Sequence, residues 1–173
     1  RASSVPDSPL VAVIKRVTDE LVGLGLLEVR PMPFVAAGKG ATVRVTNPLA
    51  EDEAFLRGDL LTTLVGRAEH NLARMPGNVR LFEIGTAFFA GETPANLPGP
   101  KKAGLPREEM HVAALVMGQR LPTHFSTPNP DSYDEWDIKY LAETVAGTAF
   151  PGTELKLVPG SGEILWDITV SGK

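Results

Sequence analysis

The spacing of apolar side chains predicts three amphipathic helices. In 8–24 apolar residues recur every three or four positions, Ser8 is placed to cap the N-terminus, and Pro9 suits the first turn. A second helix is predicted over 59–74 with Asp59 as its cap, and a third begins after Asp134 and continues to 146. Each helix has one apolar face, which predicts that all three pack on a sheet.

Alternating or continuous apolar runs predict the strands of that sheet, at 26–35, 42–45, 79–89, 111–117, 154–158 and 164–170. The run 111–117 is almost wholly apolar, so we expect a strand buried on both faces. Residues 90–109 are rich in Gly and Pro and predict a long exposed loop.

The order of these elements predicts an α+β fold with an antiparallel β-sheet flanked by helices. Several strands follow one another at hairpin distance, which favours antiparallel pairing. No internal repeat is visible, so we expect a single domain over 1–173, with 90–109 as its exposed loop.

Composition narrows the class of protein. The chain has 173 residues with 17 Gly, 15 Pro and no Cys, and its formal net charge is −4. The absence of Cys excludes disulfide scaffolds and thiolate sites and fits a reducing compartment. No apolar run approaches the ~18 residues of a membrane span. The acid excess disfavours a stand-alone nucleic-acid-binding protein, and we expect no membrane and no DNA partner.

The residues alone offer no convincing catalytic constellation. The acidic run Glu51–Glu53 fits a solvated stretch or the acidic start of a helix better than a metal site. His124 and Ser126 stand close in sequence, but a nucleophile and its base seldom reach triad geometry within one loop. We therefore expect no catalytic residue, no bound cofactor and no metal in this chain.

Five motifs in a fixed order carry a family resemblance. They are NPLAED at 47–52, LRGDLL at 56–61, RLFEIG at 80–85, HVAALVMG at 111–118 and DEWDIK at 134–139. Together they resemble the beta subunit of bacterial phenylalanyl-tRNA synthetase, in the domain that copies the class II aminoacyl-tRNA synthetase core. The resemblance covers nearly the whole chain.

The resemblance implies a scaffold, not an active site. Active class II cores carry Phe-Arg-x-Glu where this chain has Phe88-Phe89-Ala90-Gly91, and no Arg follows Arg120. An aromatic ring cannot neutralise a phosphate as Arg does. The residues expected to form the scaffold or the subunit interface are Asn47, Pro48, Leu49, Arg57, Leu60, Leu61, Arg80, Phe82, Glu83 and Gly85.

The partner is then implied to be the alpha subunit of a cytoplasmic (αβ)2 phenylalanine-tRNA ligase. By resemblance, the whole enzyme uses ATP and Mg²⁺, the alpha subunit aminoacylates tRNA(Phe), and other modules of the beta subunit contact the tRNA. Two alternatives remain open: a free-standing small-molecule or nucleotide-binding domain that reuses the class II core, and a direct tRNA-binding module.

Overall fold

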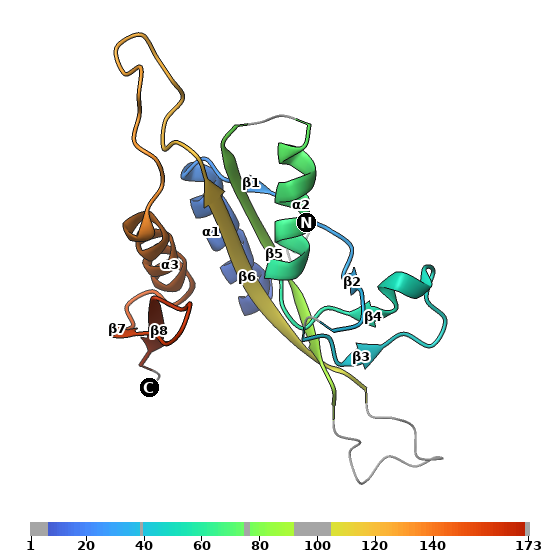
Figure 1. Cartoon of the computed structure of the whole chain (residues 1–173). Coiled ribbons are helices and arrows are strands. Elements are labelled where there is room, and N and C mark those ends of the chain that lie inside the picture. The colour runs from blue at the N-terminus through green and yellow to red at the C-terminus, as the bar shows by residue number, and fades with distance from the viewer. Residues whose placement is uncertain (1–6, 39, 75–76, 92–104, 172–173) are drawn as a thin grey trace, which may run out of the picture. The chain divides into compact units, whose positions relative to one another are not determined.

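The computed structural model describes residues 7–38, 40–74, 77–91 and 105–171 (Figure 1). Its helices are α1 (Pro9–Gly23), α2 (Leu61–Leu72) and α3 (Glu135–Ala149), with a single 3-10 turn η1 (Glu51–Glu53) in these residues. Its strands are β1 (Leu27–Glu28), β2 (Phe34–Val35), β3 (Val43–Arg44), β4 (Phe55–Leu56), β5 (Val79–Phe89), β6 (Arg107–Met117), β7 (Leu155–Pro159) and β8 (Trp166–Val170). The mixed content confirms the α+β class. None of the helices described is long and apolar enough to cross a membrane.

The chain divides into two compact units. Unit 1 comprises residues 1–27, 78–80 and 116–173, and unit 2 comprises 28–77 and 81–115. The expectation of a single domain stays a prediction.

Unit 1 is built on the packing of α1 with α3. Val17 and Leu21 on α1 are buried, as is Leu141 on α3. The Ser8 hydroxyl accepts the Val11 N–H at 3.3 Å, which confirms the predicted cap. Asp134 caps α3 in a reciprocal capping box with Asp137. The antiparallel hairpin β7–β8 packs against α3.

Unit 2 contains α2 and the small antiparallel sheet β2–β4–β3. On α2, Leu64 and Ala68 are buried one turn apart, and Phe82 on β5 is fully buried. The N-cap of α2 is Leu60, one residue after the predicted Asp59, but the Asp59 carboxylate accepts the Thr62 N–H at 2.9 Å and so still satisfies a donor of the first turn. Because both α2 and β5 bury apolar residues, unit 2 has its own hydrophobic core.

The prediction for 111–117 is wrong about burial. The strand forms, but it extends over Arg107–Met117 and none of its residues is fully buried. In the sheet order β1–β5–β6 it is an edge strand, so an apolar run here does not mean two covered faces.

The predicted loop 90–109 also extends too far at its C-terminal end. Residues 107–109 belong to β6, and 92–104 lie outside the described residues. The long strand expected over 26–35 is present only as the two-residue strands β1 and β2, consistent with the prolines between them. Strand β4, between η1 and Arg57, was not expected.

Candidate functional site

The centre of the predicted motif set is a buried ion pair in unit 2. Nη2 of Arg57 lies 2.6 Å from Oε1 of Glu83, and the two side chains are 4% and 3% exposed. Arg57 follows β4, and its backbone N–H donates to the Pro33 carbonyl at 2.9 Å. Glu83 lies at the centre of β5. The pair therefore joins two segments that are 26 residues apart along the chain.

The other two guanidinium nitrogens of Arg57 also have partners inside unit 2. Nε donates to the Thr86 carbonyl at 3.1 Å, and Nη1 donates to the Thr63 hydroxyl of α2 at 2.9 Å. The same hydroxyl lies 3.4 Å from Oε2 of Glu83. Because a buried charge is costly unless paired and hydrogen-bonded, this network explains how Arg57 and Glu83 are tolerated in the core.

Gly85 is needed for this pair. A Cβ atom at position 85 would lie 2.5 Å from Nη2 of Arg57 and 2.8 Å from Oε1 of Glu83. Both contacts are far inside van der Waals distance, so any larger residue would push the two charged groups apart. The RLFEIG motif therefore supplies the carboxylate and, two residues later, the space in which its partner fits.

The structure separates buried from exposed members of the predicted set. Leu60 and Phe82 are 2% and 0% exposed, so their side chains belong to the core of unit 2 and are not available to a partner. By contrast, Leu49 is 98% exposed and Leu61 is 56% exposed. Asn47 is also exposed, and Pro48 is half-buried. The assignment of the four exposed or half-buried residues Asn47, Pro48, Leu49 and Leu61 to a subunit interface stays a prediction.

Arg80 has a different environment, in unit 1. Its Nη2 donates to the backbone carbonyl of Arg120 at 2.6 Å and to that of Gln119 at 3.3 Å. The guanidinium also lies over the ring of Tyr133, 5.6 Å from its centre. Arg80 therefore holds both ends of the 119–133 loop, which is a scaffold role.

His124 and Ser126 lie in hydrogen-bond contact in the 119–133 loop. Nδ1 of His124 is 2.9 Å from Oγ of Ser126, in a tight turn closed by backbone hydrogen bonds between His124 and Thr127. Both residues are exposed, and the hydrogen bonds found for His124 in the described chain join it only to Ser126 and Thr127. The pair lies within this turn, and the Ser126 N–H also donates to Nδ1 of His124 at 3.4 Å, so the contact stabilises the turn.

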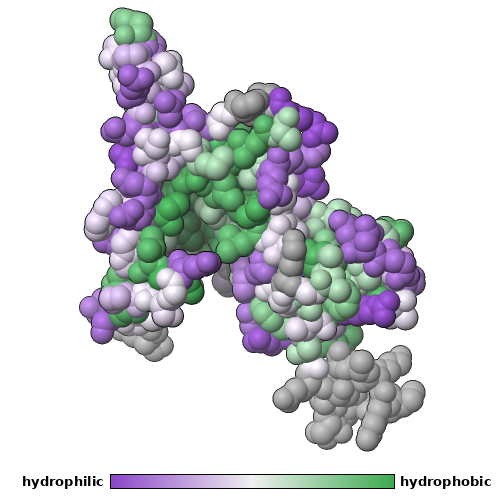
Figure 2. All heavy atoms as spheres, viewed as in Figure 1, coloured by the Kyte–Doolittle hydropathy of each residue, from purple (hydrophilic) through white to green (hydrophobic). Residues whose placement is uncertain are grey.

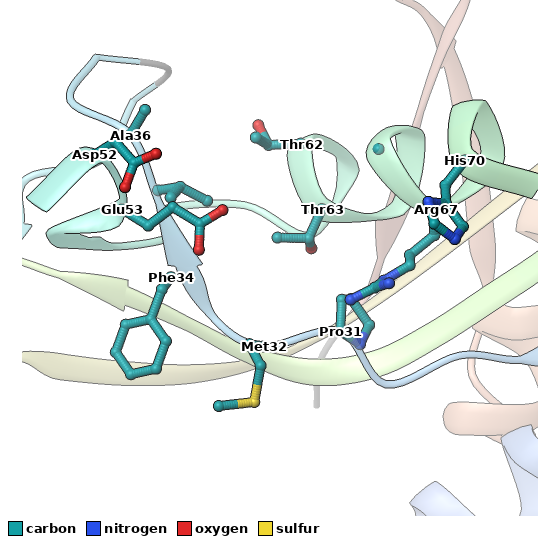
Figure 3. A pocket seen from close by; sticks show the side chains of 12 residues that line it. Pro31, Met32, Phe34, Ala36, Asp52, Glu53, Thr62, Thr63, Arg67 and His70 are labelled. Carbon is teal, nitrogen blue, oxygen red and sulfur yellow. The ribbon is translucent and has the colours of Figure 1, made fainter. Parts of the chain in front are cut away.

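Unit 2 also has an open cleft that the sequence analysis did not identify (Figure 3). It has a volume of about 510 Å³ and lies between α2 and the segments that carry β2 and η1. Asp52 and Glu53 lie at one end, Arg67 and His70 at the other, and the Met32 side chain lies between them.

The spacing of polar residues on α2 was the signal that could have revealed the cleft. Thr62, Thr63, Gly66, Arg67 and His70 recur at three- and four-residue spacing and all line it. A polar face opposite the core residues is typical of a surface helix, so this spacing predicts which side chains border open space.

Phe89, the last residue of β5, lies among aromatic and basic side chains. Its ring lies 6.1 Å from that of His111, and the Arg107 guanidinium lies 4.9 Å from its centre. The next residue, Ala90, donates its N–H to the Thr42 hydroxyl at 3.2 Å. This end of β5 is thus held by an aromatic and cationic cluster.

The fold of the chain is similar to that of solved aminoacyl-tRNA synthetases. Two structures of pyrrolysyl-tRNA synthetase from Desulfitobacterium hafniense share this fold. One superposes with a TM-score of 0.62 at 15% identity and covers 93% of this chain and 52% of that one. The other superposes with a TM-score of 0.59 at 14% identity and covers 94% of this chain and 55% of that one. At these identities the likeness concerns the fold alone.

The family is narrower than the fold. The family model of the phenylalanyl tRNA synthetase beta chain CLM domain matches residues 1–163, and the chain belongs to this family. A phenylalanine–tRNA ligase beta subunit from Bifidobacterium longum is 31% identical and covers 66% of this chain and 17% of its own length. A phenylalanine–tRNA ligase beta subunit from Xanthomonas axonopodis pv. citri is 34% identical, and the match covers 69% of this chain and 14% of that relative. The chain thus spans about one sixth of the length of these relatives.

Proposed function

We propose that this chain is a non-catalytic, core-like domain that scaffolds the alpha subunit of a phenylalanine-tRNA ligase. In this proposal the alpha subunit carries out the ATP-dependent aminoacylation of tRNA(Phe). The enzyme is a cytoplasmic (αβ)2 assembly, and ATP and Mg²⁺ bind outside this domain. Other modules of the beta subunit contact the tRNA.

The state of Arg57 carries the proposal. A nucleotide site needs cations with free donors aimed at phosphate. Here all three nitrogens of the Arg57 guanidinium are engaged by groups of unit 2, and its charge is neutralised by Glu83. At the end of β5 lies the aromatic Phe89, where the family resemblance implies an arginine in active cores. The motif residues Arg57 and Glu83 therefore serve the fold.

Exposed leucines support a role in binding a partner protein. Leu49 and Leu61 flank the segment from NPLAED to the start of α2, and both present most of their side chains to solvent. Burying a leucine stabilises an interface by about 1.5–3 kcal/mol. The segment 47–61 and helix α2 are accordingly the proposed surface for the alpha subunit.

Co-purification tests the proposal directly. The full beta subunit carrying Leu61→Glu is co-expressed with a tagged alpha subunit, and Leu121→Glu, at a leucine that is 60% exposed in unit 1, is the matched control. We expect Leu61→Glu to reduce the recovered beta subunit at least tenfold and the control to leave it unchanged. Equal recovery of both variants would refute the proposed interface.

Two further measurements discriminate the alternatives. Calorimetric titration of the chain with ATP and Mg²⁺ would show binding if it were a free-standing nucleotide-binding domain. Titration with tRNA at several salt concentrations would show steeply salt-dependent affinity if the chain bound tRNA directly. We expect neither.

A further inference from the structure

The cleft of unit 2 separates its charges by sign. The carboxylates of Asp52 and Glu53 come from η1, and the Arg67 guanidinium comes from the second turn of α2 (Figure 3). Near Arg67, Nε2 of His70 is hydrogen-bonded to the Arg74 guanidinium. An occupant that matches this pattern carries a cation at the η1 end and an anion at the α2 end.

Gly66 shows how closely an occupant can approach. It lies in the middle of α2 and lines the cleft, and a Cβ atom at this position would meet nothing within 4 Å. Glycine is a poor helix former, and the fold itself gives no steric reason for it here. Because Gly66 has no side chain, an occupant of the cleft can contact the backbone of α2 closely at a point between the two charged ends.

The openness of the cleft favours a protein segment over a small molecule. Asp52, Glu53, Gly66, Arg67 and Met32 are all exposed, Met32 by 62%. Small-molecule sites usually enclose most of their ligand. Hydrophilic residues cover much of the visible side of α2 and surround η1, with hydrophobic residues beside them (Figure 2). A protein segment bound along the cleft would contact both the hydrophilic and the hydrophobic residues of this surface.

The cleft is continuous in sequence with the surface proposed above for the alpha subunit. Leu49 lies two residues before η1, and Leu61 immediately precedes the lining residue Thr62. We propose that the cleft receives a segment of the alpha subunit that bears a Lys or Arg at the η1 end, an Asp or Glu at the α2 end, and a small or apolar residue over Gly66. This inference rests on the proposed function and specifies its partner chemistry.

The test uses the alpha and full beta subunits, co-expressed, with three cleft variants and two matched controls. Glu53→Lys reverses the charge at the η1 end of the cleft, and Arg67→Glu reverses it at the α2 end. Gly66→Leu places a side chain over the α2 backbone between these ends. Glu20→Lys and Glu108→Lys change exposed charges that lie outside both the cleft and the surface proposed for the alpha subunit. The readout is the subunit dissociation constant, obtained by dilution at several salt concentrations.

We expect each cleft variant to weaken assembly at least tenfold and both charge reversals to reduce its dependence on salt. The controls should stay within twofold of the wild type. For Gly66→Leu the melting temperature of the beta subunit should not fall, which separates a blocked cleft from a damaged fold. Cleft variants that assemble like the controls, while Leu61→Glu does not assemble, would overturn this inference and leave the proposed function intact.

If Leu61→Glu also assembles normally, the proposed interface fails as well. A small dipolar occupant is distinguished with 6-aminohexanoate as the probe. Thermal stabilisation of the wild type by this compound, lost in Gly66→Leu and accompanied by unchanged assembly of the cleft variants, would overturn the assignment to a protein segment.

Discussion

Arg57 and Glu83 form an ion pair with 2.6 Å between Nη2 and Oε1, and both side chains are almost completely buried. The pair joins the segment after β4 to the centre of β5, and Thr63 adds a contact from α2. Three elements of unit 2 thus meet at one charged contact. Such a contact fixes their mutual register because any displacement would leave a charge without a partner.

Glu83→Gln is expected to lower the free energy of unfolding of the chain by about 3–5 kcal/mol, since it leaves the Arg57 cation buried without its counter-charge. Urea denaturation followed by circular dichroism measures the change. Glu51→Gln breaks the exposed pair with Arg44 at 3.7 Å and is the control, with an expected cost below about 1 kcal/mol. A loss as small as the control's for Glu83→Gln would contradict the role given to the pair.

Replacing both partners should be less harmful than replacing one. The double variant Arg57→Met with Glu83→Leu removes both charges together, so no buried ion remains unpaired. We expect it to be more stable than either single variant, with a coupling energy of about 0.5–3 kcal/mol in the double-mutant cycle. Additive losses would show that the two side chains do not act as a pair.

Two glycine-to-alanine substitutions should have opposite effects. Gly85→Ala places a Cβ against Arg57 and Glu83 and should destabilise the chain by about 1–3 kcal/mol. Gly66→Ala adds a methyl group in open space on a helix and should stabilise it by about 0.5–1 kcal/mol. Thermal unfolding of both variants compares them. The same sign of change in both would show that the space around Gly85 does not decide its identity.

Arg80→Met should release the ends of the 119–133 loop. The variant keeps the apolar stem but loses the donors to the carbonyls of Gln119 and Arg120. We expect faster hydrogen exchange at the Arg120 amide, which donates to the Asp131 carbonyl at 2.8 Å. The Thr127 amide at the tip of the loop is the internal control, since its bond to the His124 carbonyl is local. Unchanged exchange at Arg120 would remove Arg80 from this role.

Acid should loosen the start of α3. Burial by itself would raise the pKa of Asp134, but the N–H groups of Asp137 and Trp136 and the Arg120 guanidinium outweigh it and hold that pKa below its usual value. A depressed carboxyl pKa stabilises the fold above the pKa of the unfolded chain, about 4, and this contribution is lost as the pH falls through the folded value. Unfolding measured from pH 6 to pH 2 should therefore show a weaker acid dependence in Asp134→Asn than in the wild type. Identical profiles would contradict this.

Local signals in the sequence predicted most of the elements correctly. Ser8 and Asp134 cap helices where their positions indicated, and β5 has the predicted bounds, Val79–Phe89. These features depend on side chains and backbone groups a few residues apart, so they can be inferred without knowing the fold. The five motifs likewise indicated the family that the comparison found.

Only the tertiary structure decided which of these residues are available to other molecules. The apolar run 111–117 forms an edge strand with no fully buried residue, because burial depends on which strands pair beside it. Leu60 and Leu61 are neighbours in one motif, yet one is 2% and the other 56% exposed. The sequence by itself determined the helices, the long strand and the family. The Arg57–Glu83 pair and the charged cleft depend on long-range packing, which brings together side chains that no local pattern connects.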